Sequence, residues 1–368
     1  MFGRTTRTRL ALIALVLISI ASACVAADVP KSVILLIGDG MGIGAVTAGR
    51  CAGPGRDGRL AVDTMPYTGL AITYSANALV TDSAAAGTAL ATGSKTNNGM
   101  ISVTPDGKRV QSILELAREI GKSTGIASTK FITDATPAVF VAHADSRSMN
   151  EDIAAQMVAS RVDVVLGGGR QFFLPKSAGG VRADERNLLD EAKKRGYDVF
   201  DSAEAMEKTS ASKMIGLFAA NIMTSERPEP TIAEITSKAI ATLNKNTKGF
   251  FLMSEGGKID SNEHSNDADD TVKEMLMFDD AVRAALDFAK KDGHTLVIVT
   301  ADHETGGFAV REPDKDNAKF TPGWVTNGHT ANMVPIYAFG PGSQAFTGTH
   351  DNTEIPKTIA GFWGKKLN

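Results

Sequence analysis

The chain has 368 residues, a formal net charge of −3 and 43% hydrophobic residues. A chain of this length can bury a sizeable core without help from cross-links. Because the net charge is near zero and the sequence has no basic runs, nucleic-acid binding is disfavoured and we expect no nucleic-acid partner.

The N-terminal residues have the composition of a secretory signal. Three arginines precede an apolar run over residues 10–20, and small residues follow up to Ala27. An apolar run of this length is too short to cross a bilayer, which needs about 20 residues. We therefore predict a signal peptide at 1–27, a single domain at 28–368 and a periplasmic or secreted protein.

Cys24 leaves a second interpretation of this segment open. If Cys24 receives a lipid, the mature chain is anchored to a membrane; otherwise we expect no membrane partner. Cleavage after Ala27 removes Cys24, so that Cys51 has no partner for a disulfide within the chain.

Short apolar, β-branched runs alternate with amphipathic stretches along the rest of the chain. The predicted strands are residues 33–37, 162–166, 249–253, 296–300 and 334–340. The predicted helices are residues 111–120, 188–196, 231–243 and 267–293. Runs that are apolar throughout are typical of strands buried on both faces, and their alternation with helices favours a parallel sheet. We predict an α/β fold, a three-layer sandwich with a central, mostly parallel sheet flanked by helices.

Carboxylates and imidazoles are concentrated just after these strands. The carboxyl ends of parallel strands meet at one edge of the sheet, where ligands bind in this class of fold. Mixed aspartate and histidine ligands suit zinc, whereas carboxylate and hydroxyl oxygens suit magnesium. The residues concerned are Asp39, Glu255, Asp260, His264, Asp302, His303 and His329.

Each residue also has a purely structural interpretation. Asp39 precedes a glycine, which is typical of a turn, and Asp260 and His264 stand four apart, which fits a solvated pair on one helix face. Asp82 and Ser83 open a run of small residues, and both residue types are favoured as helix N-caps. Ser83 is therefore a cap or, if the ligands after the strands reach it, a nucleophile.

Six segments, in order, resemble the alkaline phosphatase family. They are VILLIGDGMG, VTDSAAAGTALATGSKTNNG, DATPAVFVAHADSR, SEGGKIDSNEH, TADHETGG and GHT. Six separated motifs in the family order make a specific pattern that covers nearly the whole predicted mature chain. The resemblance implies an alkaline-phosphatase-like fold and a hydrolase that releases phosphate from small phosphomonoesters through a phosphoserine.

The resemblance also implies roles for individual residues. It makes Ser83 the nucleophile and Arg147 the residue that binds the phosphate. It implies two Zn²⁺ and one Mg²⁺ per chain, and two metal ions about 4 Å apart can bind both the attacking and the leaving oxygen. The implied ligands are Asp39, Asp302 and His303 for one zinc, Asp260, His264 and His329 for the other, and Asp39, Asp134, Thr136 and Glu255 for magnesium.

The chain departs from the family pattern close to the phosphate. Ser261 follows Asp260, where relatives place Lys, His or Trp, and Asp134 stands where many relatives have His. The motifs therefore predict no cation opposite Asp134. The segment 304–329 is short, without the long insertions that form the surface crown of larger members. Family members are often homodimers, and a homodimer is an open alternative for this chain.

Other functions fit parts of the same pattern. Sulfatases of this fold need Pro and Arg after the nucleophile, whereas Ala85 and Gly87 follow Ser83 here. Phosphodiesterases of the superfamily generally use threonine, so diester hydrolysis is expected only as a side activity. A secreted phosphate- or zinc-binding protein would need no nucleophile beside the metals, and Ser83 therefore favours an enzyme.

Overall fold

The structure is a computed structural model that describes residues 29–313 and 319–367. The predicted signal peptide, Cys24 included, lies outside the described residues. Within them, ten strands form one central sheet in the order β14 (Gly348–Asp351), β2 (Tyr67–Ile72), β13 (Val334–Phe339), β8 (Thr295–Thr300), β1 (Ser32–Gly38), β7 (Phe250–Gly256), β3 (Ser123–Phe131), β4 (Val164–Gly168), β6 (Met214–Leu217) and β5 (Asp198–Phe200).

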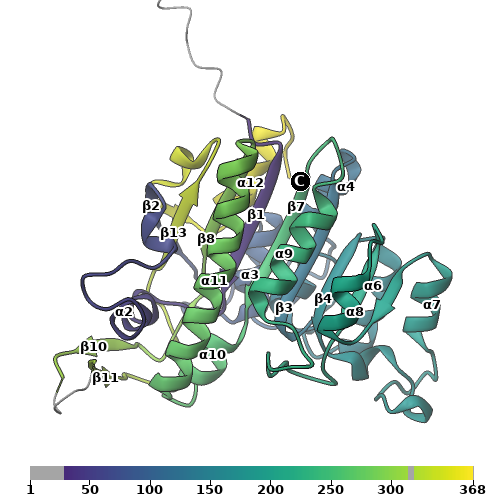
Figure 1. Cartoon of the computed structure of the whole chain (residues 1–368), viewed down its shortest axis with the longest axis horizontal. Coiled ribbons are helices and arrows are strands. Elements are labelled where there is room, and N and C mark those ends of the chain that lie inside the picture. The colour runs from purple at the N-terminus through teal and green to yellow at the C-terminus, as the bar shows by residue number, and fades with distance from the viewer. Residues whose placement is uncertain (1–28, 314–318, 368) are drawn as a thin grey trace, which may run out of the picture.

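The sheet is mostly parallel, and β13 runs antiparallel to both of its neighbours. On one face, α9 (Ile232–Leu243) packs on α11 (Ala268–Asp292), which also contacts α2 (Ile43–Ala52). On the other face, α12 (Glu354–Phe362) contacts α3 (Ser83–Thr92) and α4 (Ile113–Glu119), and α3 contacts α5 (Ala135–Ala138). Figure 1 shows α9 and α11 in front of the sheet and α3 behind it. The three-layer α/β prediction is confirmed.

The remaining elements lie towards the two ends of the sheet. Helices α6 and α8 lie beside β4, and α7 lies farther out at this end of the sheet (Figure 1), where it contacts α6 and β5. A small hairpin of β10 and β11 and a second pair, β9 and β12, follow β8. The bounds are α6 (Asn150–Ser160), α7 (Leu188–Lys194), α8 (Ala203–Lys208), α10 (Lys258–Glu263), β9 (Glu304–Thr305), β10 (Ala309–Arg311), β11 (Thr321–Gly323) and β12 (His329–Thr330).

The long helix α11 begins and ends where its sequence predicts. The Asp267 carboxylate accepts from the backbone N–H of Asp270 as N-cap, and Gly293 ends the helix in the left-handed region at φ 72°. Acidic residues in the first turn and lysines in the last complement the helix dipole. Similar local signals set the other three predicted helices, which the structure contains as α4, α7 and α9.

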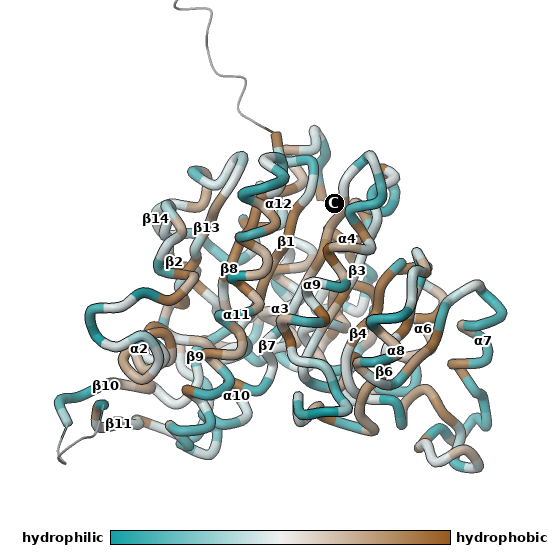
Figure 2. Tube along the Cα trace, viewed as in Figure 1, coloured by the Kyte–Doolittle hydropathy of each residue, from teal (hydrophilic) through white to brown (hydrophobic). Residues whose placement is uncertain are grey.

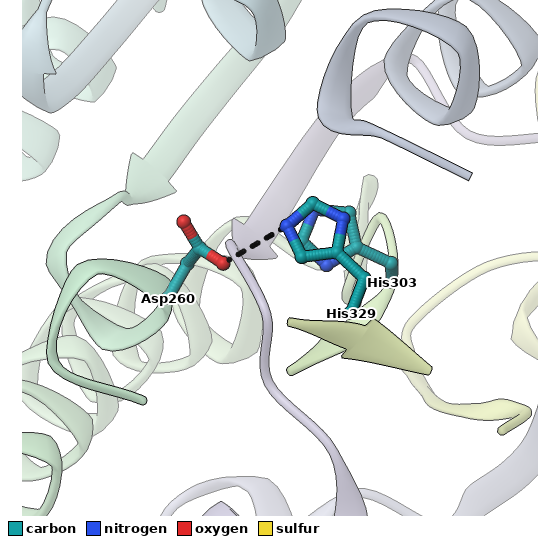
Figure 3. Close-up of side chains that lie close together, drawn as sticks. All are labelled: Asp260, His303 and His329. Atoms are coloured by element: carbon teal, nitrogen blue, oxygen red, sulfur yellow. Dashed lines mark ion pairs between the residues drawn. The ribbon is translucent and has the colours of Figure 1, made fainter. Parts of the chain in front are cut away.

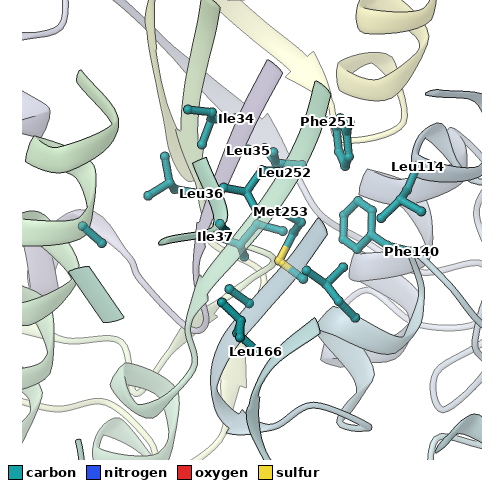
Figure 4. Close-up of a cluster of buried hydrophobic side chains, with 14 of the residues drawn as sticks. Ile34, Leu35, Leu36, Ile37, Leu114, Phe140, Leu166, Phe251, Leu252 and Met253 are labelled. Atoms are coloured by element: carbon teal, nitrogen blue, oxygen red, sulfur yellow. The ribbon is translucent and has the colours of Figure 1, made fainter. Parts of the chain in front are cut away.

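The core lies between the central strands and the helices on both faces. Side chains of β1, β7 and β4 interdigitate with Leu114 of α4 and with Phe140 (Figure 4). Figure 2 shows hydrophobic segments gathered in the central strands and hydrophilic ones in the outer loops. No helix in the ranges 29–313 and 319–367 is long and apolar enough to cross a membrane.

All five predicted strands are present, as β1, β4, β7, β8 and β13, but the sequence did not reveal the other five strands of the sheet, which are β2, β3, β5, β6 and β14. The register places the ends of four strands in line. Ile37 of β1 pairs with Glu255 of β7 and with Thr300 of β8, and Glu255 pairs with Ser128 of β3. The residues that follow these positions therefore meet at one edge of the sheet, where the predicted ligands lie.

Candidate active site

Asp39, Asp302 and His303, which we call the inner group, lie at the ends of β1 and β8. Nε2 of His303 is 3.5 Å from Oδ1 of Asp39 and 3.3 Å from Oδ2 of Asp302. All three side chains are buried, and these two carboxylate oxygens have no hydrogen-bond partner among the described residues. Buried carboxylate oxygens without a partner are costly unless a cation binds them, so the inner group fits a metal ion.

Asp260, His264 and His329, the outer group, come from α10, its C-terminal residue and β12. Oδ1 of Asp260 is 3.2 Å from Nε2 of His264 and 3.4 Å from Nε2 of His329, and the two Nε2 atoms are 3.2 Å apart. Each histidine has its Nδ1 against a backbone carbonyl, Asn327 for His264 and Thr81 for His329. An Nδ1–H that donates to a carbonyl leaves the Nε2 lone pair for a metal.

The two groups adjoin each other. The rings of His303 and His329 are stacked with their centroids 3.5 Å apart, and Figure 3 shows both beside the carboxylate of Asp260. The hydroxyl of Thr305 donates to Oδ1 of Asp260 and lies 3.3 Å from Nδ1 of His303, so that it contacts both groups. All six predicted zinc ligands therefore lie together.

The turn after β1 brings the inner and outer groups close. Gly40 has φ 77°, a conformation that favours glycine, and a Cβ there would lie 2.9 Å from Cα of Asp260. The Gly40 N–H donates to Oδ1 of Asp302, and its carbonyl accepts from the N–H of Thr305. A larger residue at position 40 would separate Asp260 from the end of β1.

The pKa values of the histidines differ between the groups. Burial lowers the pKa of His303 well below its ordinary value, so this imidazole is neutral and ready to bind a metal. A hydrogen bond with Asp260 raises the pKa of His264 to about 9. Burial alone would lower the pKa of His329, but its bonds to Asp260 and to the Thr81 carbonyl raise it. Without a metal, His264 of the outer group therefore holds a proton at neutral pH.

Ser83 is the first residue of α3, and its hydroxyl lies 3.1 Å from Nε2 of His303. The helix is capped instead by Asp82, whose Oδ1 accepts from the N–H of Ala85. Of the two residues that could cap α3, Asp82 is the N-cap and Ser83 is not. The Ser83 hydroxyl is thus free to face the metal ligands, at the positive end of a helix dipole.

Arg147 is held next to Ser83 by two aspartates. Its Nη1 is 3.2 Å from Oδ2 of Asp82 and its Nη2 is 3.0 Å from Oδ1 of Asp134. Burial alone would lower the pKa of Arg147, but these two carboxylates raise it above its ordinary value. The guanidinium keeps donors free on a half-buried side chain, which suits a tetrahedral oxyanion such as phosphate.

Comparisons with known proteins agree with this arrangement. The family model for alkaline phosphatase matches residues 30–322 and 309–364. The chain belongs to the alkaline phosphatase family. It is 36% identical to alkaline phosphatase 3 of Bacillus subtilis over 90% of this chain and 88% of that one, and 34% identical to alkaline phosphatase of Escherichia coli over 91% and 86%. The phosphatase of the Antarctic bacterium TAB5 superposes with a TM-score of 0.84 at 37% identity, over 90% of this chain and 98% of that one. This alkaline phosphatase is thus a hydrolase of phosphomonoesters.

Lys130, near the end of β3, is a residue of the site that motif comparison missed. Its side chain is buried, and its Nζ lies 3.2 Å from Oδ2 of Asp39, 3.5 Å from Oδ2 of Asp134 and 3.5 Å from Oδ2 of Asp260. Burial alone would lower the pKa of Lys130, but the carboxylates raise it well above its ordinary value. The expectation that no cation lies opposite Asp134 is wrong, because Lys130 and Arg147 both contact it.

Two of the four residues predicted to bind magnesium contact this ammonium. Asp39 and Asp134 contact Lys130 directly, and Glu255 accepts a hydrogen bond from Ser128 of β3 through Oε2. Thr136 is buried on α5, which packs against β7. A TAB5 alkaline phosphatase mutant, 36% identical and with a TM-score of 0.83 over 92% of this chain and 99% of that one, has Mg bound in its M3 site. In this chain the ammonium of Lys130 contacts Oδ2 of Asp39 and Oδ2 of Asp134, whereas Oε1 of Glu255 is buried without a hydrogen-bond partner among the described residues. Because the ammonium takes up two of the carboxylates that magnesium would need, the set does not fit a magnesium ion beside Lys130.

Proposed function

We propose that this chain hydrolyses phosphate monoesters through a phosphoserine formed on Ser83. The observation that carries the proposal is the position of the Ser83 hydroxyl, buried at the start of α3 and 3.1 Å from Nε2 of His303. A buried hydroxyl between a helix N-terminus and two adjoining groups of metal ligands is placed for attack on a bound anion.

The reaction follows from this placement. Oγ of Ser83 gives its proton to solvent and attacks phosphorus, the ester P–O bond breaks, and the departing alcohol oxygen takes up a proton from solvent. Water then gives up a proton and attacks the phosphoserine, the bond from Oγ to phosphorus breaks, Oγ takes up a proton again, and inorganic phosphate is released. Arg147 donates to two phosphate oxygens while Asp82 and Asp134 fix its orientation.

We propose two zinc ions as cofactors, one bound by the inner group and one by the outer group. When bound, zinc lowers the pKa of a coordinated hydroxyl or water and stabilises a leaving oxygen. The orphaned oxygens of Asp39 and Asp302 support the inner position, and the Nδ1 contacts of His264 and His329 support the outer one. We leave magnesium, which the resemblance had implied, out of this centre because Lys130 lies among its predicted ligands.

A Ser83→Ala substitution tests the phosphoserine. Because the attacking atom is removed, kcat for p-nitrophenyl phosphate should fall by at least about 10³-fold. Acid quenching with radiolabelled phosphate should trap label on the wild-type chain and not on Ser83→Ala. Ser202→Ala is the matched control, because Ser202 caps the remote helix α8. Turnover of Ser83→Ala near that of the wild type would overturn the mechanism.

Chelation tests the two-zinc centre separately. Removal of zinc should abolish monoester hydrolysis, and zinc alone should restore it in parallel with the binding of about two ions per chain. Full activity of the metal-free protein would exclude zinc from the reaction.

The substrate range and location of the enzyme are further proposals. We propose a broad monoesterase; one relative, 34% identical over 91% of this chain and 90% of that one, is a streptomycin-6-phosphate phosphatase of Streptomyces griseus. Equal rates on mono- and diesters would contradict the monoesterase. We also propose export through a signal peptide ending at Ala27, which N-terminal sequencing of the mature protein tests. A mature chain that starts at a lipidated Cys24 would instead establish the anchored form.

A further inference from the structure

Lys130 is a buried cation that none of the proposed catalytic steps uses. It belongs to β3, whose pairing with β4 shifts register between Ala127 and Phe131. Its side chain points the same way as that of Ser128, two residues earlier, towards the edge of the sheet that carries the ligands. A lysine this deeply buried is rare in proteins unless carboxylates pair with it.

Three carboxylates pair with it, and they connect it to every part of the site. Asp39 directs Oδ1 to the inner group and Oδ2 to Lys130. Asp260 likewise directs Oδ1 to the outer group and Oδ2 to Lys130. Asp134 contacts Arg147 with one oxygen and Lys130 with the other. The ammonium is thus the common neighbour of both metal groups and of the phosphate-binding arginine.

We propose that the ammonium of Lys130 takes the place of magnesium. This phosphatase would then bind two metal ions, and the third positive charge of its site would be a side chain of the protein. The inference rests on the proposed function, a phosphatase with two zinc ions. Whether magnesium occupies its predicted site can nevertheless be measured without substrate.

The geometry opposes the presence of both cations. Magnesium requires oxygens at about 2.0–2.1 Å in octahedral order. Oδ2 of Asp39, the residue predicted to serve both a zinc and the magnesium, lies 3.2 Å from Nζ, an ordinary ammonium–carboxylate distance. A divalent ion among the same oxygens would lie within a few ångströms of a fixed positive charge in a buried site, where the repulsion is strong.

The residue next to Asp260 is consistent with Lys130 in the place of magnesium. Ser261 brings no positive charge after Asp260, yet the carboxylates at the sheet edge need neutralising. Lys130 supplies that charge from β3. Its position is fixed by the β3 backbone and not by a metal equilibrium, so the charge is present whatever the magnesium concentration.

Metal analysis of two substitutions at Lys130 tests the proposal. Wild-type protein, Lys130→Ala and Lys130→Met are reconstituted with zinc, dialysed against millimolar MgCl₂ and desalted. Wild type should retain no magnesium, whereas Lys130→Ala, which opens the site, should bind about one Mg²⁺ per chain. Lys130→Met removes the charge but fills the space, and should bind none.

Thermal unfolding gives a second readout. MgCl₂ should raise the Tm of Lys130→Ala by about 2 °C or more and leave the wild type unchanged. MgCl₂ should also restore lost activity to Lys130→Ala but not to Lys130→Met. Lys122→Ala is the matched control, because Lys122 is a half-buried lysine at the opposite end of the same strand, held by the carbonyls of Lys31 and Lys248.

Two results would overturn the proposal. The first is about one Mg²⁺ per chain in the wild type, since Lys130 would then be an additional cation beside a magnesium site. The second is a Lys130→Ala variant with normal zinc content that takes up no magnesium. If Lys130→Ala does not fold, the wild-type metal content and the Lys130→Met variant still decide. Failure of the Ser83→Ala test would leave these results unaffected.

Discussion

The inner and outer groups contain the same kinds of side chain but are built differently. The side chains of Asp39, Asp302 and His303 are 0–1% exposed, and they stand directly on the central strands. In the outer group the His264 side chain is 40% exposed and that of His329 is 15% exposed. The outer ligands come from a short helix end and from a two-residue strand.

The difference predicts that the two zinc ions are held unequally. A ligand set fixed by a buried sheet is preorganised and excludes water, whereas ligands on short connecting elements move more easily. We therefore expect the inner ion to exchange slowly and the outer ion to be the first that a chelator removes.

Removal of an inner ligand is the strongest way to test this comparison. His303→Ala should lower kcat/KM by more than about 100-fold, because losses of supporting residues alone cost about 10–100-fold. Zinc content should fall to about one ion per chain, and added zinc should not restore activity. His143→Ala is the control, since His143 only hydrogen-bonds Ser102 and Glu115 away from the site. If added zinc restored the activity of His303→Ala, this would contradict the prediction that the inner group binds its ion more tightly than the outer group.

Removal of an outer ligand should do less. His264→Ala removes a ligand itself and should weaken zinc binding at the outer group by about 100-fold or more, but Asp260 and His329 remain to bind the ion. Excess zinc should therefore restore much of its activity. Titration of the metal-free variant with zinc, followed by activity, measures the effect; loss of both ions would show that the groups are not independent.

Proton competition should make zinc binding at the outer group depend on pH. In the metal-free protein His264 has a pKa of about 9, so below this pH zinc must displace its proton. Affinity at the outer group should fall by about tenfold per pH unit as the pH drops from 9 towards 7. At the inner group the His303 imidazole is neutral, but burial raises the pKa of Asp302 well above its ordinary value, so zinc there displaces a proton from a carboxyl instead. A zinc affinity at the outer group that does not change between pH 9 and pH 7 would contradict this prediction.

Thr305→Val should give the smallest effect. It removes the hydroxyl that contacts Asp260 and His303 but keeps the shape of the side chain. The loss of one hydrogen bond, about 1 kcal/mol, should reduce zinc affinity or activity about fivefold. A Thr305→Ser variant, which retains the hydroxyl, should stay near the wild type. An unchanged Thr305→Val would show that the hydroxyl does not couple the groups.

Much of the fold was predictable because its strands are apolar throughout and its helices carry their own end signals. Strand β3 was not, because STGIASTKF begins with small and polar residues and ends in Lys-Phe. Its strand conformation is set by pairing with β7 and β4, which is tertiary information. The antiparallel direction of β13 is likewise a property of the sheet and not of its residues.

The site was predictable where residues follow strands or match a motif, and all six residues of the inner and outer groups were found this way. Lys130 was missed because a single lysine in a polar stretch has no periodic signal, and only the register of β3 buries it. The role of Asp82 as cap was also open, because Asp and Ser are equally favoured there.

Helix α3 has a further consequence for this enzyme. All ten of its residues are buried, and none is bulkier than Leu90. A Cβ at Gly87 would lie 3.1 Å from a side-chain atom of Val139. Larger side chains on this helix would therefore clash with their neighbours. Since an error of about 1 Å in placing a reacting atom can cost about 10²-fold in rate, α3 acts as a fixed spacer that sets how far Ser83 projects. New substrate preferences are therefore expected to arise through changes in the surrounding loops, while this helix tolerates almost none.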